Sequence, residues 1–390
     1  MSVSERQLVP LKFIGRIISG GTPTSDAANW GGDLPFVTPP DLNGLDGATV
    51  MSWGRSLTKR GASSGAALVN DAVLLSCRAP IGHVGVVSRP VAFNQGCKAI
   101  VPEDPVDLRY LAYCLVAERK ALQAAGRGTT FTELSTTELS SFKVPWPPQA
   151  ERSLNADYLD RETREIDEML MRLDRLLGLL SNLQRGSLLS LGRRLVGQGK
   201  RTRIGYLLTK HSRNIRADDG VVTAYRNGEV TLRSNRREDG YTVSFSESGY
   251  QGIEPGDLVF HGLDGFAGAV GVSDERGKAS PVYHVCEATP ITSERFMAWA
   301  LRALATNGFL EAYAFSVRQR SVDFRNWTTF AGLPIVYIPQ DEQRRLADHL
   351  DEVTRQTDAM LSKVANLKDL LIERRTALIT DVVTGKKEVV

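Results

Sequence analysis

Apolar residues recur at alternating steps of four and three along the C-terminal part of the chain. The series runs through Leu346, Leu350, Val353, Thr357, Met360, Val364, Leu367 and Leu371. This 3.5-residue period is typical of helices that wind around one another. No proline or glycine interrupts residues 341–384. The pattern therefore predicts one helix of about 40 residues, roughly 60 Å long at 1.5 Å per residue, with Gly385 placed as its C-cap.

The same pattern occurs earlier in the chain. Residues 148–180 align without a gap with residues 339–371, and many letters are identical, beginning with Pro-Gln in both copies. The apolar series of the first copy is Leu159, Glu162, Ile166, Met169, Leu173, Leu176, Leu180 and Leu183. The distance between the copies is too long for a solenoid repeat, so a domain and its helix are duplicated. Gly178 and Gly186 predict that the first helix is the less regular one.

A lone amphipathic helix of this length would leave its apolar stripe in water. We expect the two helices to bury each other's stripes as an intramolecular antiparallel coiled coil. Two alternatives remain open: each helix packs on its own globular domain, or the chain dimerises through the helices. The residues expected to pair the helices are Leu159, Ile166, Met169, Leu173, Leu176 and Leu180 in the first, and Leu346, Leu350, Val353, Met360, Val364, Leu367 and Leu371 in the second.

The segments outside the helices have the character of strands and short helices. Short β-branched runs bounded by glycine and proline predict strands at 71–76, 82–88, 257–261 and 269–273. Residues 110–115 and 296–301 are both amphipathic and predict the same helix in two copies, and Cys97-Lys98-Ala99 answers Cys286-Glu287-Ala288. We predict an α+β protein with pseudo-twofold duplication: two mixed α/β domains (1–147 and 198–338) and two long helices (148–197 and 339–390).

Composition and charge limit the possible classes. The chain has 390 residues, of which 42% are hydrophobic and 24% charged, as in globular proteins. No apolar run of membrane-spanning length and no signal-peptide core occurs, so we expect a cytoplasmic protein that does not enter a membrane. The four cysteines, Cys77, Cys97, Cys114 and Cys286, are scattered and predict buried free thiols. A net charge of +3 means that any nucleic-acid surface must come from local clusters.

Motifs for catalysis are missing from the sequence. There is no GxxxxGK[ST] phosphate loop and no Asn/Asp-Pro-Pro-Tyr/Phe motif of adenine methyltransferases. The five histidines, His83, His211, His261, His284 and His349, do not share a spacing that suggests a metal site. We therefore expect no catalytic residues, no metal and no cofactor in this chain.

Several stretches together resemble one family. They are Gly20–Thr24 (GGTPT), Trp30-Gly31, Leu34–Val37, Phe93–Cys97 (FNQGC), Gly126–Leu134, the helix openings Pro147–Glu151 and Pro339–Gln343, and the tail Glu373–Lys386. In this order they resemble the specificity (S) subunit of type I DNA restriction–modification systems over nearly the full length. The first helix departs from the pattern, with Arg152 where the second has Gln343, and the second domain lacks the GGTPT block. These departures suggest a weakened or specialised first helix and a second domain of another subtype.

The resemblance implies a division of labour. Each globular domain would be a target-recognition domain that reads one half of a bipartite, asymmetric site in double-stranded DNA. The helices would set the spacing and dock two methyltransferase (M) subunits, with restriction (R) subunits as possible further partners. S-adenosylmethionine, ATP and Mg would then belong to the partner subunits. Two alternatives remain: a recognition subunit of another DNA-methylation or anti-phage system, and a non-catalytic coiled-coil scaffold.

Candidate DNA contacts are basic and amide side chains on loops, since Arg and Lys bind phosphates or guanine, and Asn or Gln can read adenine. In the first domain they are Lys59, Arg60, Arg78, Arg127, Thr129 and Thr130. In the second domain they are Lys210, Arg213, Arg233, Asn235, Arg236, Arg237, Arg318, Gln319, Arg320, Arg325 and Asn326.

Overall fold

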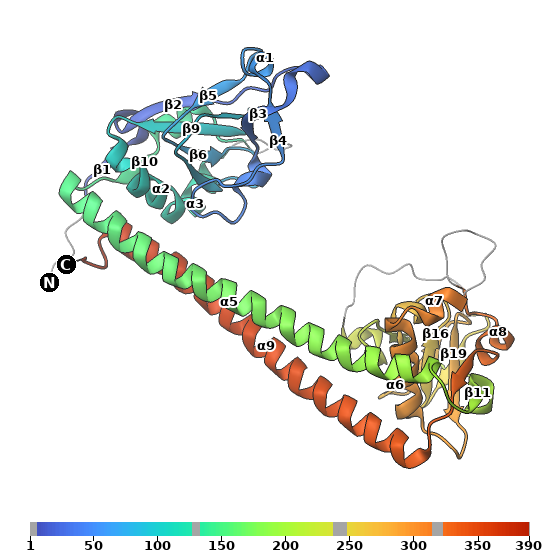
Figure 1. The fold of residues 1–390 in the computed structure, drawn as a ribbon. Helices are drawn as coiled ribbons and strands as arrows, with labels where there is room; N and C mark the ends of the chain where they lie inside the picture. The colour runs from blue at the N-terminus through green and yellow to red at the C-terminus, as the bar shows by residue number, and fades with distance from the viewer. Residues whose placement is uncertain (1–5, 127–132, 237–247, 314–322, 390) are drawn as a thin grey trace. The chain divides into compact units, whose positions relative to one another are not determined.

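A computed structural model describes residues 6–126, 133–236, 248–313 and 323–389. It divides into two units (Figure 1). Unit 1 comprises Met1–Leu173 and Asn366–Val390, and unit 2 comprises Asp174–Ala365. Two long helices, α5 (Gln149–Val196) and α9 (Gln340–Thr384), each contribute one part to unit 1 and the other part to unit 2. Both helices begin directly after a proline, as expected for the first helical turn.

The globular part of unit 1 is built on two four-stranded sheets. The first has the antiparallel order β2 (Gly15–Ser19), β9 (Cys97–Pro102), β6 (Ala72–Ser76) and β7 (Val84–Val87). The second has the order β4 (Arg55–Leu57), β3 (Trp30–Val37), β8 (Val91–Phe93) and β5 (Ala67–Val69). A short pair, β1 (Leu8–Pro10) with β10 (Lys143–Pro145), lies beside the start of α5. The helices are α1 (Lys59–Ala62), α2 (Leu108–Ala117), α3 (Arg119–Ala125) and α4 (Thr136–Ser141).

Unit 2 repeats the first of these sheets. Its antiparallel order is β12 (Leu208–His211), β19 (Tyr283–Ala288), β16 (Leu258–His261) and β17 (Val270–Val272). Three two-stranded pairs complete the strands: β11 (Arg201–Arg203) with β20 (Pro334–Val336), β13 (Val222–Ala224) with β14 (Val230–Leu232), and β15 (Gln251–Ile253) with β18 (Gly277–Ala279). The helices are α6 (Glu294–Thr306), α7 (Phe309–Tyr313) and α8 (Trp327–Ala331).

The repeated sheet confirms the duplication, but its register corrects one detail. Gly15 pairs with Pro102 at the start of β2, and Leu208 pairs with Ala288 at the start of β12. The end of β9 therefore corresponds to the end of β19, and Cys97 corresponds to Tyr283 rather than to Cys286. The three-letter likeness around the two cysteines is a chance match, displaced by three residues. All four cysteines are buried and free, as predicted.

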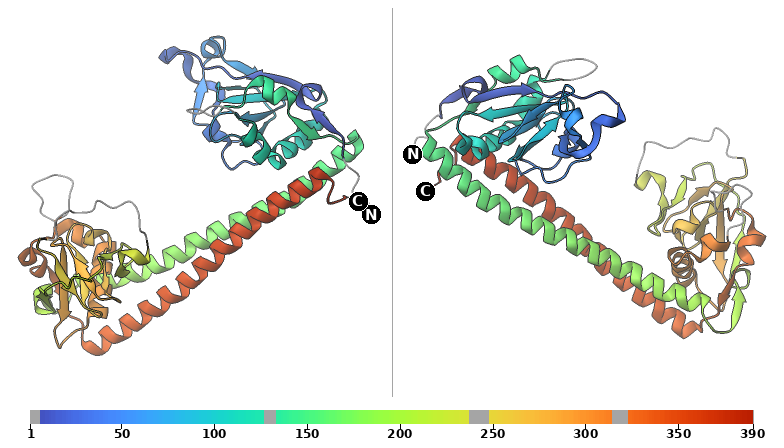
Figure 2. Two further views of the ribbon diagram at one scale, coloured as in Figure 1. Left: turned by 180° about the vertical axis from the view of Figure 1, so that it is seen from behind. Right: turned by 45° about the horizontal axis from the view of Figure 1, so that its top comes forward.

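Each unit has a core that combines its sheet, its amphipathic helix and the adjacent ends of α5 and α9. In unit 1, the core of α2 includes Leu159 from α5 and Val382 from α9. In unit 2, the core of α6 includes Leu191 from α5 and Leu350 from α9. The first and last described residues of unit 1 lie at the same end of its helical pair (Figure 2). There Arg6 donates hydrogen bonds to the carbonyls of Val382 and Val383 and pairs with Glu151.

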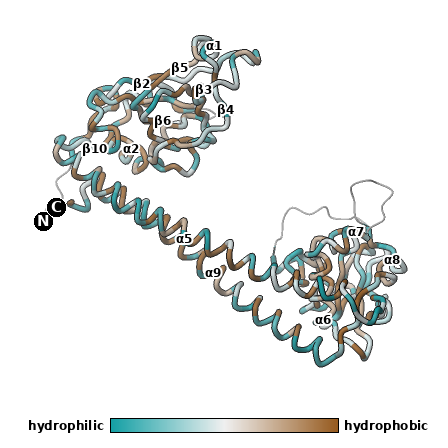
Figure 3. The backbone as a smooth tube through the Cα atoms, in the orientation of Figure 1, coloured by the Kyte–Doolittle hydropathy of each residue, from teal (hydrophilic) through white to brown (hydrophobic). Residues whose placement is uncertain are grey.

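Within each unit the two long helices run antiparallel, and hydrophobic residues recur along both of them (Figure 3). The buried stripe differs from the predicted one at every second step. Predicted pairing residues Met169, Leu176, Met360 and Leu367 are 39–51% exposed. The buried or half-buried positions are instead Leu159, Thr163, Ile166, Leu170, Leu173, Leu177 and Leu180 on α5, and Leu350, Thr354, Thr357, Leu361, Val364, Lys368 and Leu371 on α9.

The physical reason for this displacement is that two apolar series with the same 3.5-residue period run one residue apart along each helix, so Leu170, Leu177 and Leu361 are half-buried in place of Met169, Leu176 and Met360. Polar residues also occupy part of the helix interface. Thr163 and Thr357 are nearly fully buried, and the Oγ1 of each donates a hydrogen bond to a carbonyl one turn earlier in its own helix. At one step the series selects Leu367 and passes over the half-buried Lys368 beside it. Leu346 and Val353, also predicted to pair the helices, are half-buried. The same displacement in both copies agrees with their common origin.

The expected irregularity of the first helix is wrong. α5 is continuous over 48 residues, three more than the 45 of α9. A side chain at Gly178 or Gly186 would meet no atom within 4 Å, so both glycines lie in open space. Each costs about 1 kcal/mol relative to alanine, which the buried face of so long a helix offsets. No helix in the described part of the chain is long and apolar enough to cross a membrane.

Candidate nucleic-acid interface

The domain of unit 1 is fixed to the long helix by an arginine and a tyrosine on α2. Arg109 forms ion pairs with Asp157, at 2.9 Å, and Asp160 on α5. The Tyr113 hydroxyl donates a hydrogen bond to the other oxygen of Asp160 at 2.8 Å. Asp160 is thus held from two sides, which fixes the direction in which α2 crosses α5.

Unit 2 repeats this anchor residue by residue. Arg295 of α6 pairs with Asp348, at 2.7 Å, and with Asp351 on α9. The Trp299 indole N–H donates to Asp351 at 2.6 Å, in the place that the tyrosine hydroxyl has in unit 1. Both aspartates belong to the sequence repeat. We call these two sets of contacts, Arg109 with Tyr113 and Arg295 with Trp299, the domain anchors.

A second contact at the start of each long helix corrects the interpretation of Arg152. This side chain forms a two-pronged ion pair with the buried Asp107, at 2.6 and 2.8 Å, and donates to the Pro147 carbonyl at 2.7 Å. In unit 2, Gln343 donates to the Ile338 carbonyl at 2.7 Å and accepts from Thr292 at 2.8 Å. Arg152 therefore replaces a neutral contact with a charged one, and the start of the first helix is not weakened.

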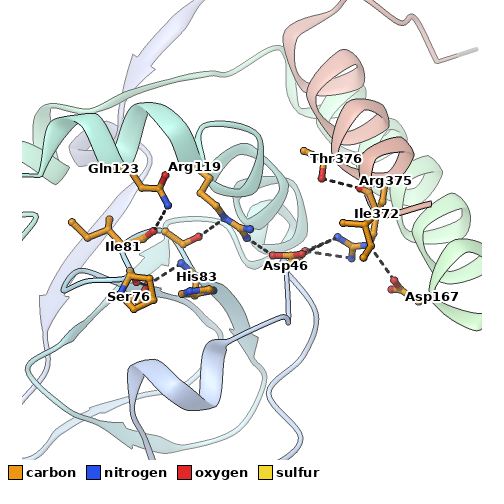
Figure 4. Close-up of polar contacts among 12 residues, drawn as sticks. Asp46, Ser76, Ile81, His83, Arg119, Gln123, Asp167, Ile372, Arg375 and Thr376 are labelled. Carbon is orange, nitrogen blue, oxygen red and sulfur yellow. Dashed lines mark hydrogen bonds and ion pairs between the residues drawn. The ribbon is translucent and has the colours of Figure 1, made fainter. Parts of the chain in front are cut away.

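A polar network in unit 1 connects α9 to the loops of the globular domain (Figure 4). Arg375 donates to Asp167 of α5 at 3.1 Å and to the carbonyl of Asp46 at 3.5 Å. The Asp46 carboxylate pairs with Arg119 of α3, whose Nε donates to the Gly82 carbonyl at 2.9 Å. The loop directly after Arg78 is therefore connected to both long helices through Arg119 of α3 and Asp46.

The candidates of the first domain lie on two separate elements. Lys59 and Arg60 are exposed on α1, and Arg60 pairs with Asp26 at 2.9 Å. Arg78 pairs with Glu133 at 3.0 Å on the strand-like segment where residues 78 and 133 bridge. Arg127, Thr129 and Thr130 lie outside the described residues.

Two arginine–tryptophan pairs of the same domain were missed from the sequence. The Arg55 guanidinium lies 3.4 Å from the ring centre of Trp30, and that of Arg89 lies 4.3 Å from the ring centre of Trp53. Such pairs present a positive charge on a flat, rigid support, a combination that suits nucleic acid. The sequence signal was weak, because strand pairing and loops bring each arginine to its tryptophan.

In the second domain the structure assigns structural contacts to three candidates. Arg213 pairs with the buried Asp257. Arg325 hydrogen-bonds Asp323 at 2.6 Å and thereby lowers the pKa of that carboxyl. The Asn326 side chain accepts from the Thr329 backbone at 3.2 Å and caps α8. Lys210 is exposed on β12. Arg237, Arg318, Gln319 and Arg320 lie outside the described residues.

Arg233 and Arg236 line one cavity of unit 2, of about 610 Å³. Arg226, His261 and Asp264 lie in its wall as well. The remaining candidate of this cluster, Asn235, donates to Thr231 at 2.9 Å and does not line the cavity. We call this cavity the arginine pocket. Charge density along the sequence pointed to Arg233 and Arg236, whereas Arg226 and His261 come from other loops.

Among the residues that the structure describes, no group of three or more His, Cys, Asp or Glu side chains is placed to hold a metal ion. Burial raises the pKa of the Cys77 and Cys286 thiols to about 12. Those two thiols are therefore protonated at neutral pH and unreactive as nucleophiles.

Comparison with known proteins finds relatives of part of the chain. The type I restriction modification DNA specificity domain matches residues 4–172. The MjaIX specificity subunit of Methanocaldococcus jannaschii is 31% identical over 154 residues, which are 38% of this chain and 36% of that subunit. The HindI specificity subunit of Haemophilus influenzae is 28% identical over 145 residues, 36% of this chain and 32% of that subunit. The matched stretches thus span only about a third of either relative.

Solved structures share the fold over almost the whole chain. A chain from a type I R-M system, solved to explain its complex assembly and conformational transition, has a TM-score of 0.66 at 13% identity and covers 97% of this chain and 98% of its own. The HsdS subunit from Thermoanaerobacter tengcongensis has a TM-score of 0.53 at 12% identity, with 98% of both chains covered. Residues 4–172 are therefore similar to the type I restriction modification DNA specificity domain, and the chain as a whole shares the fold of the HsdS subunit.

Proposed function

We propose that this chain is the DNA-specificity subunit of a type I restriction–modification complex. Each globular domain reads one half of a bipartite, asymmetric DNA site, and the paired helices set the spacing of the halves. The chain performs no chemistry itself. S-adenosylmethionine, ATP and Mg are used by the methyltransferase and restriction subunits with which it assembles.

The repeated domain anchor carries this proposal. Arg109 and Arg295 attach two domains to equivalent positions of two equivalent helices. The domains themselves differ, since only unit 1 has the four-stranded sheet of β4, β3, β8 and β5 among the described strands. Two different DNA-reading domains on one pair of equivalent helices suit a DNA site whose halves differ, whereas a symmetric dimer would read a palindrome.

Exposed apolar residues on the long helices support the docking of two methyltransferase subunits. Unit 1 exposes Met169 on α5 and Leu367 and Leu370 on α9. Unit 2 exposes the equivalent residues Leu176 and Leu179 on α5 and Met360 on α9, and in addition Leu183. Leucine and methionine stripes of this kind are uncommon on free surfaces and mark contact sites for proteins. One stripe in each unit fits one methyltransferase subunit in each.

A comparison of DNA methylation in cells tests the proposal. The gene would be expressed with its neighbouring methyltransferase gene, and each gene would also be expressed alone. We expect N6-methyladenine at one bipartite, asymmetric motif only when both genes are present. A chain carrying Arg109→Ala and Arg295→Ala, which loosens both domains, should lose the motif, while the exposed Arg172→Ala should retain it. Methylation that does not depend on this chain, or the absence of any bipartite motif, would refute the proposal.

A further inference from the structure

The arginine pocket of unit 2 is assembled from four separate parts of the chain. Its walls come from the turn after β13, the 3-10 turn Arg233–Asn235, the loop after β16 and the start of β19. Arg226, Arg233 and Arg236 line this space. Positive groups from two loops that surround one cavity indicate a binding site for an anion.

Neighbouring residues hold these guanidinium groups in place. Arg226 pairs with Asp264 at 2.9 Å, and Arg236 pairs with Glu229 at 3.0 Å. Arg236 also lies 4.3 Å from the ring centre of Tyr225. The Arg233 Nε donates to the Thr223 hydroxyl at 3.4 Å. Because the side chains are already positioned, less conformational entropy is lost when an anion binds.

His261 adds a neutral donor. Its Nδ1 accepts the backbone N–H of Leu263, at 3.2 Å, and that of Asp264, at 3.0 Å. An accepting Nδ1 means that the proton of the neutral ring is on Nε2. Burial lowers the pKa of His261, so the ring is neutral at pH 7. The pocket thus offers hydrogen-bond donors from arginines and a histidine, which suits a ligand that has only acceptors.

The aromatic rings of the pocket argue against a nucleobase as the ligand. One face of Tyr225 is covered by Arg236. Tyr283 is buried and packs edge-on against His261, with 4.5 Å between the ring centres. Neither ring leaves a free pair of faces between which a base could stack. A phosphate needs no stacking surface and accepts from several arginine N–H groups at once.

We propose that the arginine pocket binds a backbone phosphate of the DNA half-site read by the second domain. The contact fixes the duplex against this domain and carries no sequence information of its own. This inference rests on the proposed function, and it names the chemical group that the second domain holds.

The test measures how the binding of DNA by the full-length chain depends on salt. The probe is a fluorescent duplex of random sequence, so the specific site need not be known. Each lost phosphate contact should reduce the slope of log K against log salt by about 0.9. We expect this reduction in Arg233→Gln and Arg236→Gln, but not in Arg344→Gln, an equal charge change at an exposed position of α9. Arg236→Lys should retain the slope, because lysine also binds phosphate.

Three outcomes would overturn the inference. Unchanged slopes in both glutamine variants, with binding intact, would refute the pocket and leave the proposed function standing. A lysine variant as impaired as the glutamine variant would indicate bidentate reading of a base. Stabilisation of the chain by inorganic phosphate or a nucleotide, with no competition from duplex DNA, would assign the pocket to a free phosphate.

Two further controls keep these outcomes distinct. Arg236 is exposed, so its substitution leaves a folded chain for measurement even where Arg233→Gln unfolds; unchanged circular dichroism confirms this. A wild-type chain that binds no duplex at about 50 mM salt would count against the proposed function and the pocket together. Binding by the wild-type chain with unaffected variants counts against the pocket alone.

Discussion

Gln184 of α5 donates a hydrogen bond to Asp358 of α9 at 2.8 Å, in the position of unit 2 that Arg375 and Asp167 occupy in unit 1. The sequence repeat relates these pairs residue by residue, with the two helices exchanged. Both units therefore have a side-chain contact between the helices at this position, but the donor is a neutral glutamine in unit 2 and a charged arginine in unit 1. In unit 1 the arginine also reaches Asp46 of the globular domain, so one side chain connects α5, α9 and a loop.

Substitution of Arg375 should therefore destabilise the chain more than the same substitution of its exposed neighbour Arg374. Arg375→Gln, which introduces the residue of unit 2, leaves Asp167 and Asp46 without this partner. We expect a loss of about 1–3 kcal/mol in the free energy of unfolding, because Arg375 is buried and its partners are half-exposed. Urea unfolding followed by circular dichroism measures the loss. Arg374→Gln, on the exposed side, should change stability by less than about 0.5 kcal/mol; equal effects would contradict the role of the network.

Arg152→Gln makes the start of α5 resemble that of α9. The substitution leaves Asp107 buried without its two-pronged partner, since glutamine cannot supply a charge. A buried carboxylate that loses its partner costs about 3 kcal/mol. The measurement is again the free energy of unfolding, with Arg161→Gln as an exposed control on the same helix. A second change, Asp107→Asn, should restore part of the loss; without such a restoration the pair is not the cause.

The long helices could be predicted from the sequence because their signals are local. Pro148, Pro339 and Gly385 mark ends that the structure places within one residue. The face that each helix buries could not be predicted, since adjacent apolar residues such as Met169 and Leu170 fit the same 3.5-residue period equally well. The domain anchors join residues about 50 positions apart, and only the fold shows that the repeated aspartates have arginine partners. Only one wall of the arginine pocket could be predicted, from the dense run of basic residues that includes Arg233 and Arg236. The other wall comes from loops that are distant in the sequence.

Because only one face of α9 is buried, substitutions of two adjacent leucines should affect different properties of the chain. Leu371 is 6% exposed and Leu370 is 61% exposed. Leu371→Ala should lower the free energy of unfolding by about 2–4 kcal/mol, as for other core leucines. Leu370→Ala should leave stability nearly unchanged but weaken binding of the methyltransferase, measured by titration calorimetry. If Leu370→Ala unfolds the chain and Leu371→Ala does not, the helix face assigned here is wrong.

His284 should make the stability of unit 2 depend on pH. The residue is fully buried, its Nε2 lies 2.7 Å from the Phe324 carbonyl, and burial lowers its pKa to about 4. In the unfolded chain the pKa is about 6.5, so between these values the unfolded state binds a proton that the folded state does not. Stability is therefore complete above pH 6.5 and is lost as the pH falls, by up to about 1.4 kcal/mol per pH unit.

His284→Gln removes this titration and can keep the hydrogen bond to Phe324. Urea unfolding at pH 7, 6 and 5 should show a smaller loss for this variant than for the wild-type chain. His349→Gln, at an exposed position of α9, should behave like the wild-type chain. Parallel loss in all three proteins would show that carboxylates, rather than His284, cause the acid sensitivity.

The helical frame makes a prediction about DNA sequence rather than stability. Gln184 faces Asp358, so Leu176 of α5, two turns earlier, lies near Ala365 of α9 in the same unit. One heptad inserted after Leu176 and another after Ala365 keep the buried stripe of both helices in phase. Each insertion adds about 10 Å of helix, which corresponds to about three base pairs. The methylated motif should then have a longer spacer between unchanged half-sites, because neither globular domain is altered. A heptad in α5 alone displaces the contacts of Gln184 and should abolish methylation. Altered half-sites in the double insertion would show that the helices take part in reading and do not only set the distance.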